Sequence, residues 1–208
     1  MTTTRLVSLL AAAAVAGTTL VGAPATAAPA GTTSLSSTLS EDGNRFDTEW
    51  GDFDVAEKAV RAVVYARPES PVGVLADGET ALTAFIPTDR AFRRYVAAQT
   101  GQRPRTERGV FRTLKQLADV ETLESVLLYH VVPGRTLTYT RARRADGAVL
   151  TTAQGGEVTV HVSAGAVRLT DLDPDAANAR IVPALSNLNR GNKQIAHGIS
   201  RVLRPTDL

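Results

Sequence analysis

The sequence contains no cysteine. This absence excludes disulfide bonds, thiolate metal sites, cysteine nucleophiles and a lipid anchor carried on a cysteine. Secreted domains below about 80 residues often depend on disulfides, but a chain of 208 residues can bury an adequate hydrophobic core without them, even after processing. The lack of cysteine therefore does not argue against an exported protein.

The sequence also lacks the short motifs that mark common enzymes. It has no Gly-x-Ser-x-Gly, no phosphate-binding loop, no dinucleotide fingerprint and no His-Glu-x-x-His. The three histidines, at positions 130, 161 and 197, are scattered, so we expect no metal site and no cofactor. The acids of residues 171–175 alternate as in a calcium loop, but Ala176 stands where that loop needs glycine, and we expect a solvated turn.

The first 30 residues have the pattern of a secretory signal peptide. Arg5 precedes an uncharged, mainly apolar stretch over residues 6–23, and small residues suited to cleavage end at Ala27 and Ala30. A membrane anchor is the alternative, because the stretch is near the minimum spanning length although only weakly apolar. No later stretch is suited to span a membrane, so after cleavage we expect a secreted protein.

Hydrophobic periodicity predicts one domain over residues 46–208, preceded by a flexible leader over residues 31–45 that is rich in Ser, Thr and Gly. The first half has mainly helical spacing, and the second half alternates as strands do, so we predict an α+β domain. Asp54, Thr88 and Thr106 are predicted N-caps. The helices expected lie at 55–66, 89–99, 106–117 and 121–129, and the strands at 81–86, 157–162, 167–169, 180–185 and 195–203.

Charge is nearly balanced overall, with a formal net charge of +2, but residues 41–57 are mainly acidic and residues 89–115 mainly basic. We predict two solvated helical faces that complement each other. Nucleic-acid binding is not expected, because the aromatic residues of the basic segment occupy helical core positions. The alternative is a basic patch for an anionic polymer of the cell envelope, made of Arg93, Arg94, Arg105, Arg108 and Arg112.

Residues 83–92 (TAFIPTDRAF) form a predicted strand-to-helix junction. The proline has no backbone donor and is expected to end a buried strand. The threonine then caps the next helix, and the aspartate favours its positive end. We predict a structural role for the residues of this junction, which are Phe85, Pro87, Thr88, Asp89 and Phe92.

Tyr129 and His130 lie in an otherwise apolar segment, residues 127–134 (LLYHVVPG). Each pairs an apolar ring with a polar tip that needs a partner when it is buried. One interpretation is that both side chains bond to the backbone and hold the two halves of the domain together. The other is that they form a binding site.

These segments resemble conserved parts of the fasciclin (FAS1) domain family. Residues 83–92 fit a Thr-x-Phe-x-Pro-Thr-Asp/Asn-x-Ala-Phe pattern, and residues 127–134 fit the central Tyr-His element. Residues 195–205 (IAHGISRVLRP) fit the final segment in part. His197 is retained there, but Lys193, Gln194, Ala196, Gly198 and Ser200 depart from the family pattern.

The resemblance implies an α+β FAS1-like fold, in which a helical first half packs on a β-rich wedge or sandwich of about seven strands. It also implies a secreted bacterial adhesion domain, not an enzyme, that recognises an extracellular protein or polysaccharide of the cell envelope or matrix. In the family the Tyr-His neighbourhood is implicated in adhesion, so Tyr129 and His130 are candidate ligand-binding residues, whereas His197 is expected to be structural. We expect a monomer with no nucleic-acid partner. The alternatives are a hydrolase that uses His197 and Ser200, and a scaffold that pairs only with another envelope protein.

Overall fold

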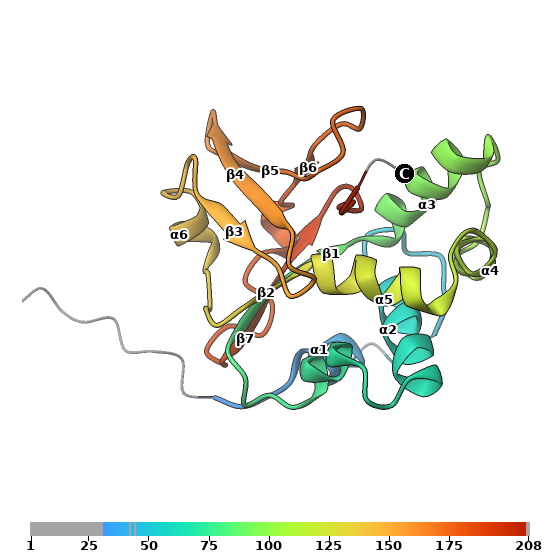
Figure 1. The fold of residues 1–208 in the computed structure, drawn as a ribbon, viewed down its shortest axis with the longest axis horizontal. Helices are drawn as coiled ribbons and strands as arrows, with labels where there is room; N and C mark the ends of the chain where they lie inside the picture. Colours follow the sequence, from blue (N-terminus) through green and yellow to red (C-terminus); the bar gives the residue numbers. More distant parts are fainter. Residues whose placement is uncertain (1–30, 42, 44, 207–208) are drawn as a thin grey trace, which may run out of the picture.

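The computed structural model describes residues 31–206 apart from residues 42 and 44, so the predicted signal peptide lies outside the described residues. Seven strands form two sheets, and the longer helices gather on one side of them (Figure 1). The predicted α+β class, with a helical first half and a β-rich second half, is confirmed. Among the described residues, no helix combines the length and apolar composition needed to cross a membrane.

A three-stranded sheet lies between the helices and the second sheet (Figure 1). Its middle strand, β1 (Leu82–Pro87), pairs antiparallel with β2 (Val131–Pro133) and parallel with β7 (Gln194–Ile199). Every residue of β1 and β7 is buried, as expected for strands covered on both faces. Because side chains alternate along a strand, Ile86 packs in the helical cluster whereas Phe85 packs toward the second sheet.

The second sheet is antiparallel, with the strand order β3-β4-β5-β6. Val158 and Val160 are buried whereas His161 is exposed, so the predicted alternation is confirmed. Ala164 and Gly165 form a two-residue turn with φ values of 48° and 77°, the geometry that suits a tight hairpin. The strands are β3 (Val149–Thr151), β4 (Glu157–Ser163), β5 (Ala166–Thr170) and β6 (Ala179–Arg180).

The longer helices are α2 (Asp54–Ala66), α3 (Asp89–Thr100), α4 (Glu107–Leu117) and α5 (Val120–Tyr129). Thr88 and Thr106 cap α3 and α4 by accepting a backbone N–H, and Gly101 ends α3 with a φ of 69°, as predicted. The predicted N-cap at Asp54 is wrong. Phe53 occupies that position without a side-chain cap, and Asp54 is the first helical residue.

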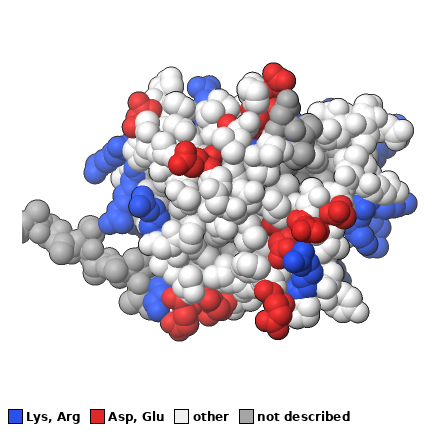
Figure 2. Space-filling view, viewed as in Figure 1, with Lys and Arg blue, Asp and Glu red and all other residues white. Residues whose placement is uncertain are grey.

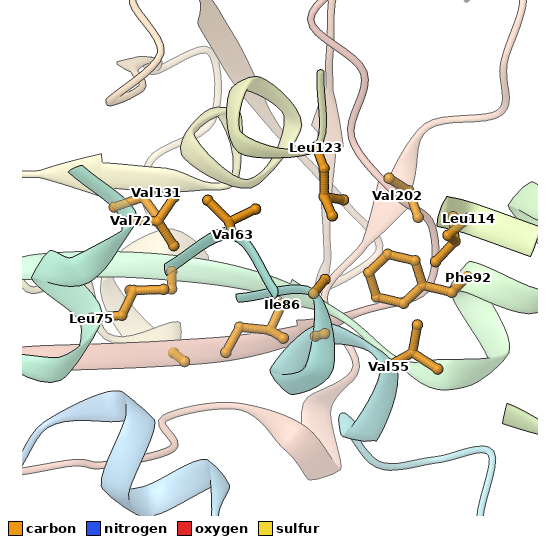
Figure 3. Packing of buried hydrophobic residues seen from close by; sticks show 14 of the residues in the cluster. Val55, Val63, Val72, Leu75, Ile86, Phe92, Leu114, Leu123, Val131 and Val202 are labelled. Atoms are coloured by element: carbon orange, nitrogen blue, oxygen red, sulfur yellow. The ribbon is translucent and has the colours of Figure 1, made fainter. Parts of the chain in front are cut away.

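Buried hydrophobic residues form two clusters that meet at β1. In the cluster beneath the helices, Phe92 lies close to Leu114 and Val202 at one end, while Val72 and Leu75 lie at the other (Figure 3). The second cluster packs the two sheets together. Its fully buried members include Phe85, Tyr129, Val158, Val160, Leu169 and Ile199.

The flexible leader predicted over residues 31–45 is wrong for its first part, which is folded onto the domain. Leu35 is fully buried and begins the short helix α1 (Leu35–Leu39). The side-chain amide of Gln194 accepts the Leu35 N–H at 2.9 Å and donates to the Val74 carbonyl at 2.7 Å. The polar composition suggested disorder, but composition does not reveal a hydrogen bond to a residue 159 positions away.

The last predicted strands are shorter than expected. The strand predicted over residues 180–185 is reduced to β6, because proline cannot donate to a ladder and the chain enters the 3-10 helix η2 (Pro183–Leu185). The strand predicted over residues 195–203 ends at Ile199, and Ser200 lies in a bend. The other short elements are η1 (Pro71–Ala76) and α6 (Tyr139–Ala142).

Candidate functional site

Tyr129, the first of the two candidate ligand-binding residues, is fully buried at the end of α5. Its hydroxyl donates to the Glu157 carbonyl at 2.6 Å and accepts the Leu172 N–H at 3.2 Å. Burial raises the pKa of this phenol to about 12. The ring packs so closely on Gly156 that a Cβ there would lie 2.8 Å from a ring carbon. Tyr129 therefore joins a helix to the second sheet.

His130 is also buried, at the C-cap of α5. Its Nδ1–H donates to the Val126 carbonyl at 2.7 Å, and its Nε2 accepts the Leu203 N–H at 2.9 Å, which fixes a neutral tautomer. Burial lowers the pKa of this imidazole to about 4. The structure thus places both Tyr129 and His130 in the interior with backbone partners, as the first of the two interpretations expected, and neither side chain is exposed as a ligand-binding residue would be.

His197 and Ser200 do not form a catalytic pair. His197 is fully buried, its Nε2–H donates to the Leu137 carbonyl at 2.7 Å, and its Nδ1 accepts the Asn187 N–H at 3.3 Å. Burial lowers the pKa of His197. The Ser200 hydroxyl accepts the Arg180 N–H at 3.1 Å. With both imidazole nitrogens engaged elsewhere, His197 cannot act as the base that a serine nucleophile requires.

The residues of the strand-to-helix junction have structural roles, with one exception. Phe85 and Phe92 belong to the two hydrophobic clusters, Pro87 is the last residue of β1, and Thr88 caps α3. Asp89, the exception, is fully buried at the first position of α3. Its Oδ1 accepts the Val55 N–H at 2.9 Å, and its carboxylate faces other acids.

A carboxylate cluster, which we define as Asp52, Asp89 and Glu107, surrounds this position. One carboxylate oxygen from each residue lies within 4.8 Å of the other two. Burial, together with the charge of neighbouring carboxylates, raises the pKa of Asp89 to about 9, that of Glu107 to about 7 and that of Asp52 to about 6. Oxygen ligands of this kind suit hard divalent cations.

Sequence reasoning missed this cluster, because it assigned the acids of residues 41–57 and Glu107 to solvated faces and gave Asp89 only a structural role at a helix start. Asp54, Asp89 and Glu107 are instead buried in the first turns of α2, α3 and α4. The usable signal was the acid that follows each predicted helix start, where the helix dipole favours a negative charge. The convergence of three helix starts at one point could not be read from spacing alone.

The five arginines of the predicted basic patch do not all line one hollow. Arg93 lies 4.3 Å from the centre of the Trp50 ring, and Arg108 lies 5.5 Å from that of Phe46. Arg94 donates to the Ser200 carbonyl at 3.3 Å, and its pKa is lowered mainly by burial and also by Arg201. Only Arg105 and Arg112, of the five predicted residues, line a common hollow.

That hollow, which we call the arginine groove, lies between the C-terminal end of α3 and α4 and has a volume of about 560 Å³. Arg103 is the third arginine in its wall, and the sequence prediction had not selected it for the patch. Basic side chains gather over this end of the molecule, at the right of the view (Figure 2). The remaining lining residues are Thr100, Gln102, Pro104, Gly109, Thr113 and Gln116.

Comparisons with known proteins agree with this architecture. The model of the fasciclin domain family matches residues 61–205. A solved FAS1 domain pair from the insect cell adhesion molecule fasciclin I is similar in structure, with a TM-score of 0.54 and 14% sequence identity. The similarity covers 83% of this chain and 51% of that chain, so this chain spans about half the length of the domain pair. No curated protein matches the chain.

The family match extends from within α2 to the segment after β7 and includes both sheets. At 14% identity the solved domain pair shows the fold alone, and the fold agrees with the two-sheet arrangement and the helical first half. The chain therefore belongs to the fasciclin (FAS1) domain family, whose members are generally non-catalytic adhesion or binding modules and are typically extracellular.

Proposed function

We propose that this FAS1 domain binds an anionic polysaccharide of the cell envelope or extracellular matrix through the arginine groove. The observation that carries the proposal is the wall of the groove, where Arg103, Arg105 and Arg112 stand together with no acidic residue among the lining side chains. The buried Tyr129 and His130 would then contribute only by holding the fold. The proposal includes export by the signal peptide predicted over residues 1–30, retention at the cell wall, and a monomeric state.

The chemistry of the groove suits a charged sugar chain. All three arginines are exposed, and a guanidinium can donate two parallel hydrogen bonds to one carboxylate, sulfate or phosphate group. Gln102, Gln116 and the two threonines offer amide and hydroxyl groups for sugar hydroxyls. The volume of about 560 Å³ falls within the range of about 300–1,000 Å³ that is typical of ligand sites.

The ends of two helices fix the shape of the groove. Gly101 closes α3, and the Thr106 hydroxyl caps α4 by accepting the Gly109 N–H at 3.1 Å. The Thr113 hydroxyl donates to the Gly109 carbonyl at 3.0 Å, so this wall is tied to its own helix.

Binding of heparin or alginate to the purified protein, with dextran as the neutral control, tests the proposal. We expect Arg105→Gln with Arg112→Gln to weaken binding about tenfold, because two exposed ion pairs are removed. The matched control is Arg143→Gln with Arg144→Gln, which alters an equally exposed arginine pair near α6. Equal loss in both double variants, or affinity that does not fall as salt rises, would contradict the proposed groove. Capture of a protein partner by both double variants would favour the scaffold alternative.

A further inference from the structure

The carboxylate cluster brings together three separate parts of the chain. Asp52 lies in the loop before α2, whereas Asp89 and Glu107 are the first residues of α3 and α4. One oxygen from each carboxylate lies within 4.8 Å of the others. Glu107 also forms a second such group with Asp47 and Asp54, so it lies between two sets of acids.

Each carboxylate of the cluster has a buried oxygen that no donor satisfies. Asp89 is 0% exposed, and its Oδ2 has no partner although its Oδ1 accepts the Val55 N–H. Glu107 is 1% exposed, and its Oε1 has no partner although its Oε2 accepts the Asp47 N–H at 2.6 Å. The Oδ1 of Asp52 is likewise buried without a partner. Because buried polar atoms are nearly always satisfied, these oxygens indicate either a proton shared between carboxyl groups, as in a side-chain hydrogen bond between Asp89 and Asp52, or a bound cation.

Arg93 and Arg108, two nearby arginines, are engaged with aromatic rings. Arg93 stacks on Trp50, and its Nε–H donates to the Pro104 carbonyl at 2.7 Å, while Arg108 lies over an aromatic ring. In the part of the chain that the structure describes, no ion pair joins Lys or Arg to a member of the carboxylate cluster. Several like charges confined at this depth need either protons or a cation.

We propose that Asp52, Asp89 and Glu107 bind a divalent cation of the calcium class, with Asp47 and Asp54 beside it. Ca²⁺ takes carboxylate oxygens at about 2.4 Å, so two oxygens on one ion can be at most about 4.8 Å apart, and the cluster meets that limit. Asp52 is half-buried and Asp47 is exposed, so the ion can reach the site from solvent. The cation would hold the loop before α2 against the starts of α3 and α4.

The only tryptophan of the chain, Trp50, is two residues from Asp52 and provides a local signal. Terbium(III) substitutes for Ca²⁺ and emits light when a nearby excited indole transfers energy to it. We expect the purified protein to sensitise Tb³⁺ emission, and Ca²⁺ to displace Tb³⁺. We also expect Ca²⁺, titrated to about 10 mM, to raise the Tm relative to the protein in chelator, since affinities of about 10⁻⁴–10⁻³ M are common in extracellular calcium sites.

Asp89→Asn and Glu107→Gln keep the side-chain oxygens that accept the Val55 and Asp47 N–H groups, so both variants should fold. Each is expected to weaken Tb³⁺ and Ca²⁺ binding at least about tenfold, as loss of a ligand charge does. The matched control is Asp175→Asn, an exposed acid in the 171–175 loop, which should bind as the wild type does. Absence of both Tb³⁺ emission and a Ca²⁺-dependent rise in Tm would overturn the site and leave protons as the species that the carboxylates share. Unchanged binding in Asp89→Asn and Glu107→Gln would also overturn it.

Discussion

Two groups of buried polar side chains in this domain differ in how their polar atoms are satisfied. In the first group, Tyr129, His130 and His197, the hydroxyl and all four imidazole nitrogens have partners within the protein. In the second group, the carboxylate cluster, each member has an oxygen without a donor. Apart from the half-buried Asp52, the members of both groups are buried, so burial alone does not distinguish the two groups.

This difference distinguishes side chains that hold the fold from side chains that are able to bind a ligand. A fully satisfied network stabilises one arrangement, and a ligand could engage it only by breaking hydrogen bonds that already exist. A buried group with unmet acceptors gains free energy when a proton or a cation arrives. The Tyr-His element, which attracted the functional hypothesis in the sequence, therefore belongs to the scaffold. The acids of the carboxylate cluster, none of which the sequence analysis selected for binding, form the better candidate site.

Breaking the satisfied group should give the largest effect. Tyr129→Ala removes a fully buried ring and both hydrogen bonds of its hydroxyl, so we expect the free energy of unfolding to fall by about 3–5 kcal/mol. Urea denaturation followed by circular dichroism measures the change. Tyr65→Ala is the matched control, because Tyr65 is 91% exposed and its loss should change the free energy by less than about 0.5 kcal/mol. Similar values for the two variants would contradict the structural assignment of Tyr129.

Acid should also break the satisfied group, through His130. Its pKa falls from 6.5 to about 4 on folding, so between these values the unfolded chain binds a proton that the folded protein does not. The stability contributed by the neutral imidazole is therefore complete above pH 6.5 and is lost as the pH falls toward 4. The shift corresponds to about 3 kcal/mol.

The expected result is that the wild type loses about 3 kcal/mol more than His130→Gln between about pH 7 and about pH 4. The remaining titrating groups are common to both proteins, so the difference between their unfolding free energies isolates His130. Urea denaturation at several pH values gives the two curves. Parallel curves would show that His130 is protonated equally in the folded and unfolded states.

The fold was predictable from the sequence wherever a local pattern determines an element. Alternation located β4 and β5, and the Thr88 and Thr106 caps located the starts of α3 and α4. Long-range packing determined what was missed. Gln194, which departs from the family pattern, holds α1 to the domain through its side-chain amide. At Gly198, a Cβ would lie only 2.7 Å from the Leu185 side chain, so η2 packs against β7 only because this position has no side chain.

The candidate site was less predictable, because it depends on which helix starts meet. The sequence places Asp89 and Glu107 within a basic segment, where pairing with arginine is the ordinary expectation. In the fold these two acids turn toward Asp52, while Arg93 is held on Trp50. Neither the charge count nor the helical spacing indicates whether these acids face Asp52 or an arginine, because this orientation follows from the packing of α2, α3 and α4.

Neutralising Asp89 tests the second group of the comparison, the carboxylate cluster. Folding raises the pKa of Asp89 from 3.8 to about 9, so its stabilising contribution is complete below 3.8 and is lost as the pH rises through about 9. In chelator at about pH 8, Asp89→Asn should be more stable than the wild type by about 1–3 kcal/mol, because the Asp89 carboxyl must take up a proton when the wild type folds at this pH, whereas the amide is already neutral. The advantage should vanish near pH 4. A variant that is less stable than the wild type at about pH 8 in chelator would show that the carboxylate is satisfied in the metal-free protein.

The smallest effect on stability is expected at the arginine groove, which is neither buried nor part of either group. Arg105→Gln with Arg112→Gln should change the free energy of unfolding by less than about 0.5 kcal/mol, because both side chains are exposed. The same double variant is expected to lose about tenfold in affinity for an anionic polysaccharide. Urea denaturation and polysaccharide binding, measured on one preparation, place the two effects side by side. Surface arginines contribute about 2 kcal/mol or more only within a packed network. A stability loss of that size would therefore show that the groove arginines hold the fold, as the buried Tyr129 and His130 do.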